Sequence, residues 1–467
     1  MPITDRIKAA IRHGMIMSAM AAFMFVSLIG GPVVAAEVAF PGAVGYGAVA
    51  DGWRGGRLIP VTNLKDHGPG SLRNCVERDG PRICVFRISG TIRLNGPLMA
   101  RSDLYIAGQT APGTGIQLRL GNSRHGPLII KNAQDVVVRF LKLRPGVGTG
   151  KTSNIDALTV ENASRLYLGN LSLMFATDET FNIHVVNGTA TDITLADSIL
   201  AYSLDRANHP KGRHSKGALI CSGDGQDNAC GRISLLRNIF AHHRDRNPDI
   251  KATAAGPVEV INNIFYNPIS QFGEFYDLLG NTRIAYIGNL ALTGPSTITD
   301  ITAAVELFDW AEGHEISVWM EDNIAQDCRS EKRLPVADPV AVLHKAKAPV
   351  ETTIPAMPAS MLARTLPGQA GDILPGGNHR DKLDQRVVTE LARCEGQVID
   401  RPGNVGGWTH FAAVRAAPDS DGDLLPDAWE RKQTGLDPMR ADNPWRDPDG
   451  DGLSAVEDWL AELAGDQ

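Results

Sequence analysis

The stretch RISLLRNIF, residues 232–240, is followed by PVEVINNIF at 257–265 and RIAYIGNLA at 283–291. Each alternates apolar and polar residues around a central polar or glycine pair, and DVVVRFLKL (135–143), RLYLGNLSL (165–173) and DITLADSIL (192–200) do the same. Successive copies lie 25 to 40 residues apart. Short strands at such a period predict a solenoid, because one coil cannot bury its apolar face alone. The alternative is a sandwich, in which turns would recur every ~8–12 residues. We therefore predict an all-β chain folded as a parallel β-helix.

Three asparagines fall at the same place in successive copies, namely Asn238, Asn263 and Asn289. An amide side chain both donates and accepts hydrogen bonds, so stacked amides can bond to one another from coil to coil. We expect a hydrogen-bonded ladder of asparagines inside a turn of the solenoid.

The composition is that of a globular chain with many turns. Of 467 residues, 43% are hydrophobic and 21% charged, with 48 glycines and 28 prolines. The net charge is −7, yet residues 419–467 hold 14 acidic and 4 basic residues, so the rest of the chain is slightly basic. No dense run of lysine or arginine is present, which argues against nucleic acid as a partner.

The N-terminal residues have the pattern of an export signal. A basic segment, RIKAAIRHG, precedes an apolar segment, MIMSAMAAFMFVSLIG, and small residues end at Ala36. We interpret 1–36 as a signal peptide, with an uncleaved anchor as the alternative, and we expect no membrane span after cleavage. Six cysteines agree with an oxidising compartment. Proximity in sequence favours three bridges: Cys75–Cys84, Cys221–Cys230 and Cys328–Cys394.

Basic residues gather in two neighbouring copies of the repeat. The longest spacing contains an insertion, 202–231, and solenoids place insertions where binding occurs. One copy later, FAHHRDRNPDIK (240–251) ends an apolar strand with two histidines, two arginines and a lysine. Stacking of coils predicts that both segments lie on one flank.

Several motifs together resemble the pectate lyases of the right-handed parallel β-helix kind. They are AFPGAVGYG, VTNLKDHGPGSLRNCV, VFRISGTIRL, LYIAGQTAPGTGI, HSKG, AHHRDRNPD and VIDRPGNVGGW, and they span about residues 39 to 408. The resemblance implies a secreted, extracellular or periplasmic enzyme that cleaves de-esterified homogalacturonan by calcium-dependent β-elimination. It implies a β-helix domain over 37–410, and we expect a monomer whose partner is an acidic polysaccharide.

The same resemblance implies roles for basic residues. Arg246 would remove the C5 proton, and Lys216 would hold the substrate carboxylate as charge develops on it. Lys251, His214 and His243 would contact substrate. For Arg246 the alternative is a carboxylate clamp, because an arginine pKa exceeds 12. For His243 the alternative is a packed core histidine.

Calcium would be held by acidic residues of the two coils before Lys216. Asp156 matches one family ligand, strand alternation favours Asp178 as the second, and Asn182 is a weaker third, with Glu179 in reserve. Asn154 and the pair Gly169-Asn170 stand where many relatives carry Asp or His. The metal site therefore has fewer charged ligands than in many relatives. The main alternative is a non-catalytic protein that binds pectic polysaccharide. A pectin lyase is a further one, although few aromatic residues favour an acidic substrate.

The acidic tail, 411–467, resembles the Asp-rich calcium repeats found at the ends of secreted proteins. In DSDGDLLPDAWE the acids occupy positions 1, 3, 5, 9 and 12 of a calcium loop, with the Leu425 carbonyl at position 7. DPDGDGLSAVEDW repeats the idea. The predicted structural calcium ligands are Asp419, Asp421, Asp423, Asp427, Glu430, Asp447, Asp449, Asp451 and Glu457. We predict a small helical calcium-binding module here.

Residues 296–377 are rich in proline and alanine, and we expect long loops or irregular coil there. KLDQRVVTELARCEG (382–396) has the pattern of a helix that caps or flanks the solenoid.

Overall fold

The computed structural model describes residues 38–298, 301–338 and 349–466, which belong to one compact unit. The predicted signal peptide, 1–36, lies outside the described residues. None of the described helices is long and apolar enough to cross a membrane.

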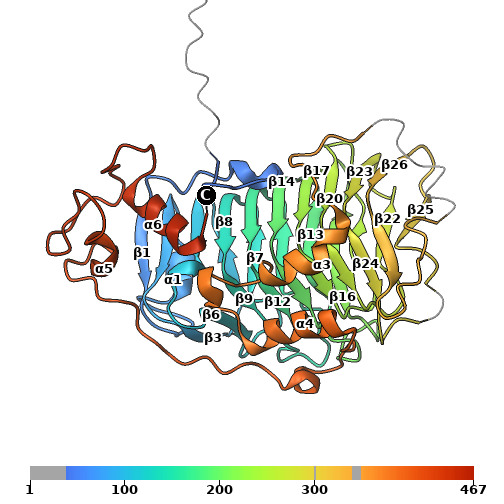
Figure 1. Cartoon of the computed structure of the whole chain (residues 1–467), viewed down its shortest axis with the longest axis horizontal. Coiled ribbons are helices and arrows are strands. Elements are labelled where there is room, and N and C mark those ends of the chain that lie inside the picture. Colours follow the sequence, from blue (N-terminus) through green and yellow to red (C-terminus); the bar gives the residue numbers. More distant parts are fainter. Residues whose placement is uncertain (1–37, 299–300, 339–348, 467) are drawn as a thin grey trace, which may run out of the picture. The chain divides into compact units, whose positions relative to one another are not determined.

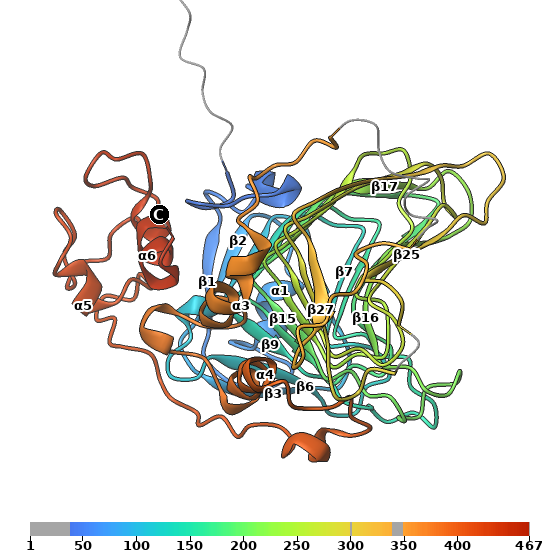
Figure 2. The same cartoon turned by 45° about the vertical axis from the view of Figure 1, so that its right-hand side comes forward.

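Three parallel sheets form the walls of the described chain, and each coil contributes one strand to a sheet (Figures 1 and 2). The ten-stranded sheet contains, in order, β1 (Arg57–Val61), β2 (Arg82–Phe86), β5 (Leu104–Ala107), β8 (Gln134–Arg139), β11 (Ser164–Gly169), β14 (Thr189–Ala196), β17 (Ala229–Leu236), β20 (Val258–Ile261), β23 (Thr282–Ile287) and β26 (Ile316–Glu321). The nine-stranded sheet contains β3 (Gly90–Leu94), β6 (Ile116–Leu120), β9 (Leu141–Leu143), β12 (Ser172–Met174), β15 (Ile199–Ala201), β18 (Ile239–Ala241), β21 (Ile264–Tyr266), β24 (Leu290–Thr293) and β27 (Ile324–Asp327). The eight-stranded sheet contains β4 (Leu98–Ala100), β7 (Leu128–Lys131), β10 (Leu158–Glu161), β13 (Glu179–Val186), β16 (Lys216–Asp224), β19 (Asp249–Ile250), β22 (Gly273–Tyr276) and β25 (Val305–Phe308).

The predicted right-handed parallel β-helix is confirmed, and the repeat sets its register. Leu166 pairs with Val136 on one side and with Ile193 on the other, so the first apolar positions of the repeat stack in one column. The residues of this column have no solvent exposure and belong to the main apolar cluster inside the coils.

The polar pair in each repeat makes a corner between the ten- and nine-stranded sheets. Its first member has a left-handed backbone, with φ of 55° at Arg237, 57° at Asn262 and 64° at Gly288. Glycine and asparagine tolerate that conformation best. Its second member forms the predicted ladder: Asn238 Nδ2 donates to Asn263 Oδ1 at 3.1 Å, and Asn263 Nδ2 donates to Asn289 Oδ1 at 3.2 Å.

The helices are short and lie outside the coils. They are α1 (Leu72–Val76), α3 (Leu362–Thr365), α4 (Lys382–Arg393), α5 (Asp427–Glu430) and α6 (Ala455–Ala464), together with 3₁₀ turns at Tyr46–Val49, Gly108–Thr110, Ala359–Met361, Leu366–Gly368, Pro375–Gly377 and Pro402–Val405. The predicted flanking helix is α4, and the side chain of Asp381 caps its start.

Buried ion pairs fix α4 and the segment before it against the nine-stranded sheet. Arg144, just after β9, bonds to Asp384 at 2.9 Å and also to Asp381, and Lys142 of β9 pairs with Asp372. All these side chains have at most 1% exposure. Removing one partner would leave a buried charge without compensation, which costs about 3–5 kcal/mol.

The expectation of irregular coil over 296–377 is wrong in part. The described residues of this stretch continue the solenoid with β25, β26 and β27. Asn289 Nδ2 donates to Asn323 Oδ1 at 3.1 Å, so the asparagine ladder also extends into this coil. The 34-residue spacing from Asn289 to Asn323 and the more polar strands hid the repeat in the sequence.

The acidic tail packs on the outer face of the first coils. Trp429 of α5 and Trp459 of α6 share an apolar cluster with Trp53 and with outward side chains of β2, β5 and β8. Arg139 of β8 pairs with Asp466 at 2.6 Å. Figure 1 shows α5 and α6, in red, at the β1 end of the solenoid.

Two of the three predicted disulfides are present, Cys75–Cys84 and Cys221–Cys230. The third is a correction: Cys328 and Cys394 are free thiols in this structure. They do lie together, since Cys394 Sγ donates to the Cys328 carbonyl oxygen at 2.6 Å.

Candidate active site

Charged residues gather where successive strands of the eight-stranded sheet begin. In chain order these are Asp156 before β10, Asp178 and Glu179 at β13, Lys216 at β16, and Arg246 before β19. Lys216 pairs in register with Glu179, so the parallel coils bring residues far apart in sequence side by side.

Asp156, Asp178 and Glu179 form a carboxylate cluster. One oxygen of each lies within 4.8 Å of the others. Burial and the neighbouring Asp178 raise the pKa of Asp156 to about 7. Burial, Asp156 and Asp178 together raise the pKa of Glu179 well above its usual value. Like charges at this distance disfavour one another, so the cluster would be stabilised by a cation.

Two histidines from the 202–231 insertion contact the carboxylate cluster. The rings of His209 and His214 stack with centroids 3.7 Å apart. Their Nε2 atoms lie 3.3 Å and 2.7 Å, respectively, from the two carboxylate oxygens of Asp178. Burial alone would raise the pKa of Asp178, but the hydrogen bond from His214 lowers it below its ordinary value. The insertion therefore does close over this flank.

The basic residues are all paired with acids. Arg246 Nη1 pairs with Glu179, and its Nε lies 3.6 Å from Asp249 Oδ2. Lys216 Nζ lies 2.6 Å from Asp245 Oδ1, and Lys251 Nζ lies 3.1 Å from Asp249 Oδ2. Burial lowers the pKa of Arg246, but Glu179 and Asp249 outweigh it and raise the net value. Arg246 is therefore a guanidinium cation in this structure.

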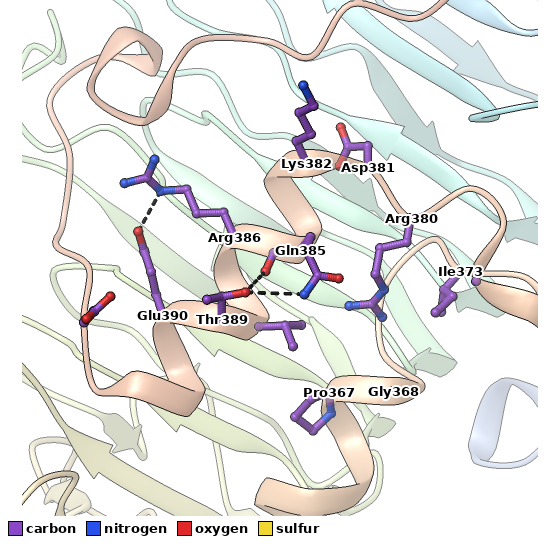
Figure 3. Close-up of a pocket in the computed structure, with 13 residues that line it drawn as sticks. Pro367, Gly368, Ile373, Arg380, Asp381, Lys382, Gln385, Arg386, Thr389 and Glu390 are labelled. Carbon is purple, nitrogen blue, oxygen red and sulfur yellow. Dashed lines mark hydrogen bonds and ion pairs between the residues drawn. The ribbon is translucent and has the colours of Figure 1, made fainter.

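A large hollow lies elsewhere on the molecule. It has a volume of about 930 Å³ and is lined by α4 and by the segment around Pro367 (Figure 3). It shares no residue with the carboxylate cluster or its basic partners, and α4 packs on the nine-stranded sheet rather than the eight-stranded one. The charged residues of the candidate active site therefore lie on the eight-stranded sheet and not in this hollow.

Comparison with known proteins identifies relatives along nearly the whole chain, although no family model matches the sequence. A protein named probable pectate lyase C, from Aspergillus terreus, is 32% identical over 441 residues, which cover 92% of this chain and 95% of the relative. A protein of the same name from Aspergillus fumigatus is 32% identical over 428 residues, covering 88% and 90%. The chain belongs to the pectate lyase family.

Solved structures agree on the fold of this pectate lyase family member. The crystal structure of jun a 1, the major allergen from cedar pollen, has a TM-score of 0.53 at 20% identity and covers 70% of this chain and 92% of that one. The thermostable pectate lyase PL 47 has a TM-score of 0.51 at 13% identity and covers 70% and 96%.

Most of the residues that the pectate lyase resemblance singled out lie in one cluster. Arg246 pairs with Glu179 and Asp249, Lys251 also pairs with Asp249, and Lys216 pairs with Asp245. His214 reaches the cluster through Asp178. Their catalytic and binding roles stay predictions.

His243 is a correction. It has 1% exposure and bonds to Thr180 Oγ1 and Asn247 Oδ1, each at 3.0 Å. Burial lowers the pKa of His243 to about 3, so it is a neutral core residue that does not face substrate. The packed-histidine alternative holds. Its neighbour His242 is also fully buried and has a left-handed backbone, with φ of 60°.

Asn182, the weaker third ligand of the prediction, contacts the carboxylate cluster through its amide. Its Nδ2 donates to Asp156 Oδ2 at 3.1 Å, and its Oδ1 lies 3.4 Å from Ser222 Oγ. In this structure it positions the Asp156 carboxylate, and its role as a calcium ligand stays a prediction. Glu179, the reserve, lies in the carboxylate cluster. Gly169 and Asn170 lie at the corner between β11 and β12 and are not members of the carboxylate cluster.

Three further acids of the site were missed from the sequence. Asp245 and Asp249 flank Arg246 and were read only as parts of a basic motif. Glu274 of β22 pairs in register with Asp249. Burial, with Asp245 and Asp249 nearby, raises the pKa of Glu274 to about 8. The pairing register between coils brings these acids together, and it cannot be obtained from one sequence alone.

The tail acids form two groups that overlap at Asp423. Asp419, Asp421 and Asp423 make one, and Asp423, Glu430 and Asp442 make the other. Burial and the neighbouring Asp423 and Asp421 raise the pKa of Glu430 to about 7. A separate exposed group contains Asp447, Asp449 and Asp451, whose metal role stays a prediction.

Two predicted tail ligands, Asp427 and Glu457, accept hydrogen bonds from nearby serines in this structure, and their metal role stays a prediction. Asp427 accepts hydrogen bonds from the backbone N–H and the Oγ of Ser420, both at 2.7 Å. Glu457 accepts from the backbone and side chain of Ser454 in a capping box and pairs with Arg54 at 2.6 Å. Neither belongs to an acidic group that could hold a cation among the described residues.

Proposed function

We propose that the protein is a secreted pectate lyase that cleaves polygalacturonate by β-elimination and leaves a 4,5-unsaturated end. One observation carries the proposal. In a chain of this family, the carboxylate cluster, Lys216, Arg246 and Lys251 lie along successive coils of one sheet face. The signal-like segment and two disulfides support export to an oxidising compartment.

The carboxylate cluster has the chemistry of a calcium site. Calcium prefers several hard oxygen ligands at 2.3–2.6 Å and takes mono- or bidentate carboxylates readily. Asp156, Asp178 and Glu179 offer such oxygens within 4.8 Å of one another, and protein groups neutralise them only in part. When bound, calcium would neutralise the substrate carboxylate next to C5 and so make that carbon more acidic.

Arg246 would take the C5 proton, and Lys216 would hold the charge that develops on the carboxylate. In this structure Arg246 is held by Glu179. Any cation that draws the Glu179 carboxylate into the cluster weakens this ion pair and lowers the pKa of Arg246. We infer that a cation bound to the carboxylate cluster prepares Arg246 to act as a base. Lys251, which pairs with Asp249, would bind the carboxylate of a second uronate.

The test is ultraviolet absorbance of unsaturated uronide ends during incubation with polygalacturonate. We expect a signal with calcium that a chelator removes. Retention on pectin without any product would favour the non-catalytic binding protein. A signal only with methyl-esterified polymer, unaffected by the chelator, would favour a pectin lyase.

Asp178→Asn is expected to raise the calcium concentration needed for half-maximal activity by about 10-fold or more, because a ligand is lost. Asp192→Asn is the matched control, since Asp192 pairs with Arg232 on the ten-stranded sheet, away from the site. Equal calcium dependence in both variants would remove Asp178 from the metal site.

We also propose that the tail holds a structural cation at Glu430. Glu430 has no solvent exposure, and neither carboxylate oxygen has a hydrogen-bond partner among the described residues. Oδ2 of Asp421 is likewise buried and unpaired there. An isolated buried carboxylate is costly, whereas calcium would satisfy it. Asp419, Asp421, Asp423, Glu430 and Asp442 would supply the ligands, with Asp442 in the place first given to Asp427.

A further inference from the structure

Beyond Lys251 a group of aromatic side chains begins on the face of the eight-stranded sheet. Tyr276 of β22 pairs in register with Phe308 of β25, and their rings stack at 4.5 Å with an angle of 11°. Trp310 stands against both rings at 5.2 Å, with angles near 65°. We call these three residues the aromatic platform.

Trp310 is the exposed member of the aromatic platform, with 65% of its surface in solvent. Its main chain is nevertheless held firmly. The buried carboxylate of Asp277 accepts hydrogen bonds from the backbone N–H groups of Trp310, at 3.0 Å, and Ala311, at 3.1 Å. His314 Nδ1 lies 2.7 Å from the Asp277 carbonyl oxygen. A large aromatic ring presented to solvent on a fixed backbone is a prepared contact surface.

The aromatic platform is continuous with the candidate active site. Asp249 pairs with Glu274 and Glu274 with Glu306, so the residues two positions on, Lys251, Tyr276 and Phe308, form the next row on the same face. Lys251 Nζ lies 5.0 Å from the centroid of the Tyr276 ring. Adjacent strands are about 4.8 Å apart, so β25 lies roughly 10 Å along the solenoid from β19.

We propose that the aromatic platform is a substrate subsite that binds one sugar ring of the polyuronate chain, beyond the ring that Arg246 attacks. The pyranose ring has a face of C–H bonds with slight positive charge, and this face complements the negative face of an indole. Trp310 would stack on that face, with Tyr276 and Phe308 supporting it from behind. Lys251 lies between Asp249 and the aromatic platform, where it would bind the carboxylate of the sugar between the attacked ring and the stacked ring. The proposal rests on the proposed function for the identity of the polymer.

Trp310→Ala is expected to weaken binding of polygalacturonate by about 5- to 10-fold, measured as mobility in gels that contain the polymer. Trp310→Phe should retain part of the binding, because it keeps an aromatic face. Met439→Ala, at a site with 74% exposure in the tail, is the control. In the lyase assay we expect a higher KM for long chains, unchanged kcat, and no change for oligomers too short to reach β25.

The outcomes separate this subsite from the proposed function. Loss of gel retention in Trp310→Ala, in a protein that makes no unsaturated product, would support the aromatic platform and defeat the lyase. Lyase activity with equal retention and equal KM in wild type and Trp310→Ala would overturn the aromatic platform alone. A wild-type protein that the polymer does not retard would overturn it as well.

Discussion

Replacing Arg246 with alanine is expected to lower turnover of polygalacturonate by about 10³-fold, within the range that a general base contributes. Arg246 lies outside the apolar core of the coils, and its loss leaves the buried Glu179 without its arginine partner, so thermal unfolding of the variant is measured beside its activity. The drop should appear in kcat, because abstraction of the C5 proton happens only in the transition state. The assay is the initial rate of unsaturated product at saturating substrate and calcium.

The competing role for Arg246 is a carboxylate clamp, and the same variant distinguishes the two. A clamp that binds substrate and transition state equally would raise KM and leave kcat nearly unchanged. Arg232→Ala is the matched control, since Arg232 is a half-exposed arginine paired with Asp192 on another sheet. A folded Arg246→Ala protein with wild-type kcat would eliminate the base assignment.

Glu430→Gln is expected to remove most of the stabilisation that calcium gives the folded protein. In the wild-type protein, a cation that binds only the folded tail adds about 2.7 kcal/mol at 100 times its dissociation constant. The variant should lose most of this gain, because it lacks the central buried carboxylate. In chelator the variant should be at least as stable as wild type, since it no longer buries an unpaired charge.

Thermal unfolding with calcium and with chelator measures both effects. Asp437→Asn is the control, because Asp437 is an exposed tail acid outside the acidic groups that could hold a cation. If Glu430→Gln shifted with calcium as much as Asp437→Asn and the wild type, the tail would have no cation site at Glu430.

The sequence was sufficient for features that repeat or stay local. Asn238, Asn263 and Asn289 occupy equivalent positions of the sequence repeat, because a parallel solenoid has the same corner in successive coils. The helix α4 was also predictable, from an apolar periodicity with Asp381 at its start. The ladder depends on equivalent positions in adjacent coils, and the helix depends on residues close together in sequence.

The sequence was insufficient where a carboxylate had a choice of partners. Asp427 and Glu457 fit a linear calcium pattern, but in the structure their oxygens accept hydrogen bonds from Ser420 and Ser454. Asp442 enters the Glu430 group from 12 residues downstream, outside any loop motif. Glu179 was hard to place because its oxygen is shared between a carboxylate cluster and Arg246. Such competition is decided by three-dimensional contacts and not by spacing.

The contact between the tail and the first coils has a consequence for how the chain is made. Trp445 Nε1 donates to the Gly56 carbonyl oxygen at 2.7 Å, and Trp53 lies in one cluster with Trp459. During synthesis the first coils emerge long before Trp445 and Trp459. The outer face of the first coils therefore stays exposed to solvent while the middle coils form. The N-terminal strands therefore cannot reach their final stability until the tail that contains Trp445 and Trp459 has been synthesised. We expect the first coils of a nascent chain to be less stable than the middle coils and to reach their final stability last. This differs from the N-to-C order of folding that is usual for domains.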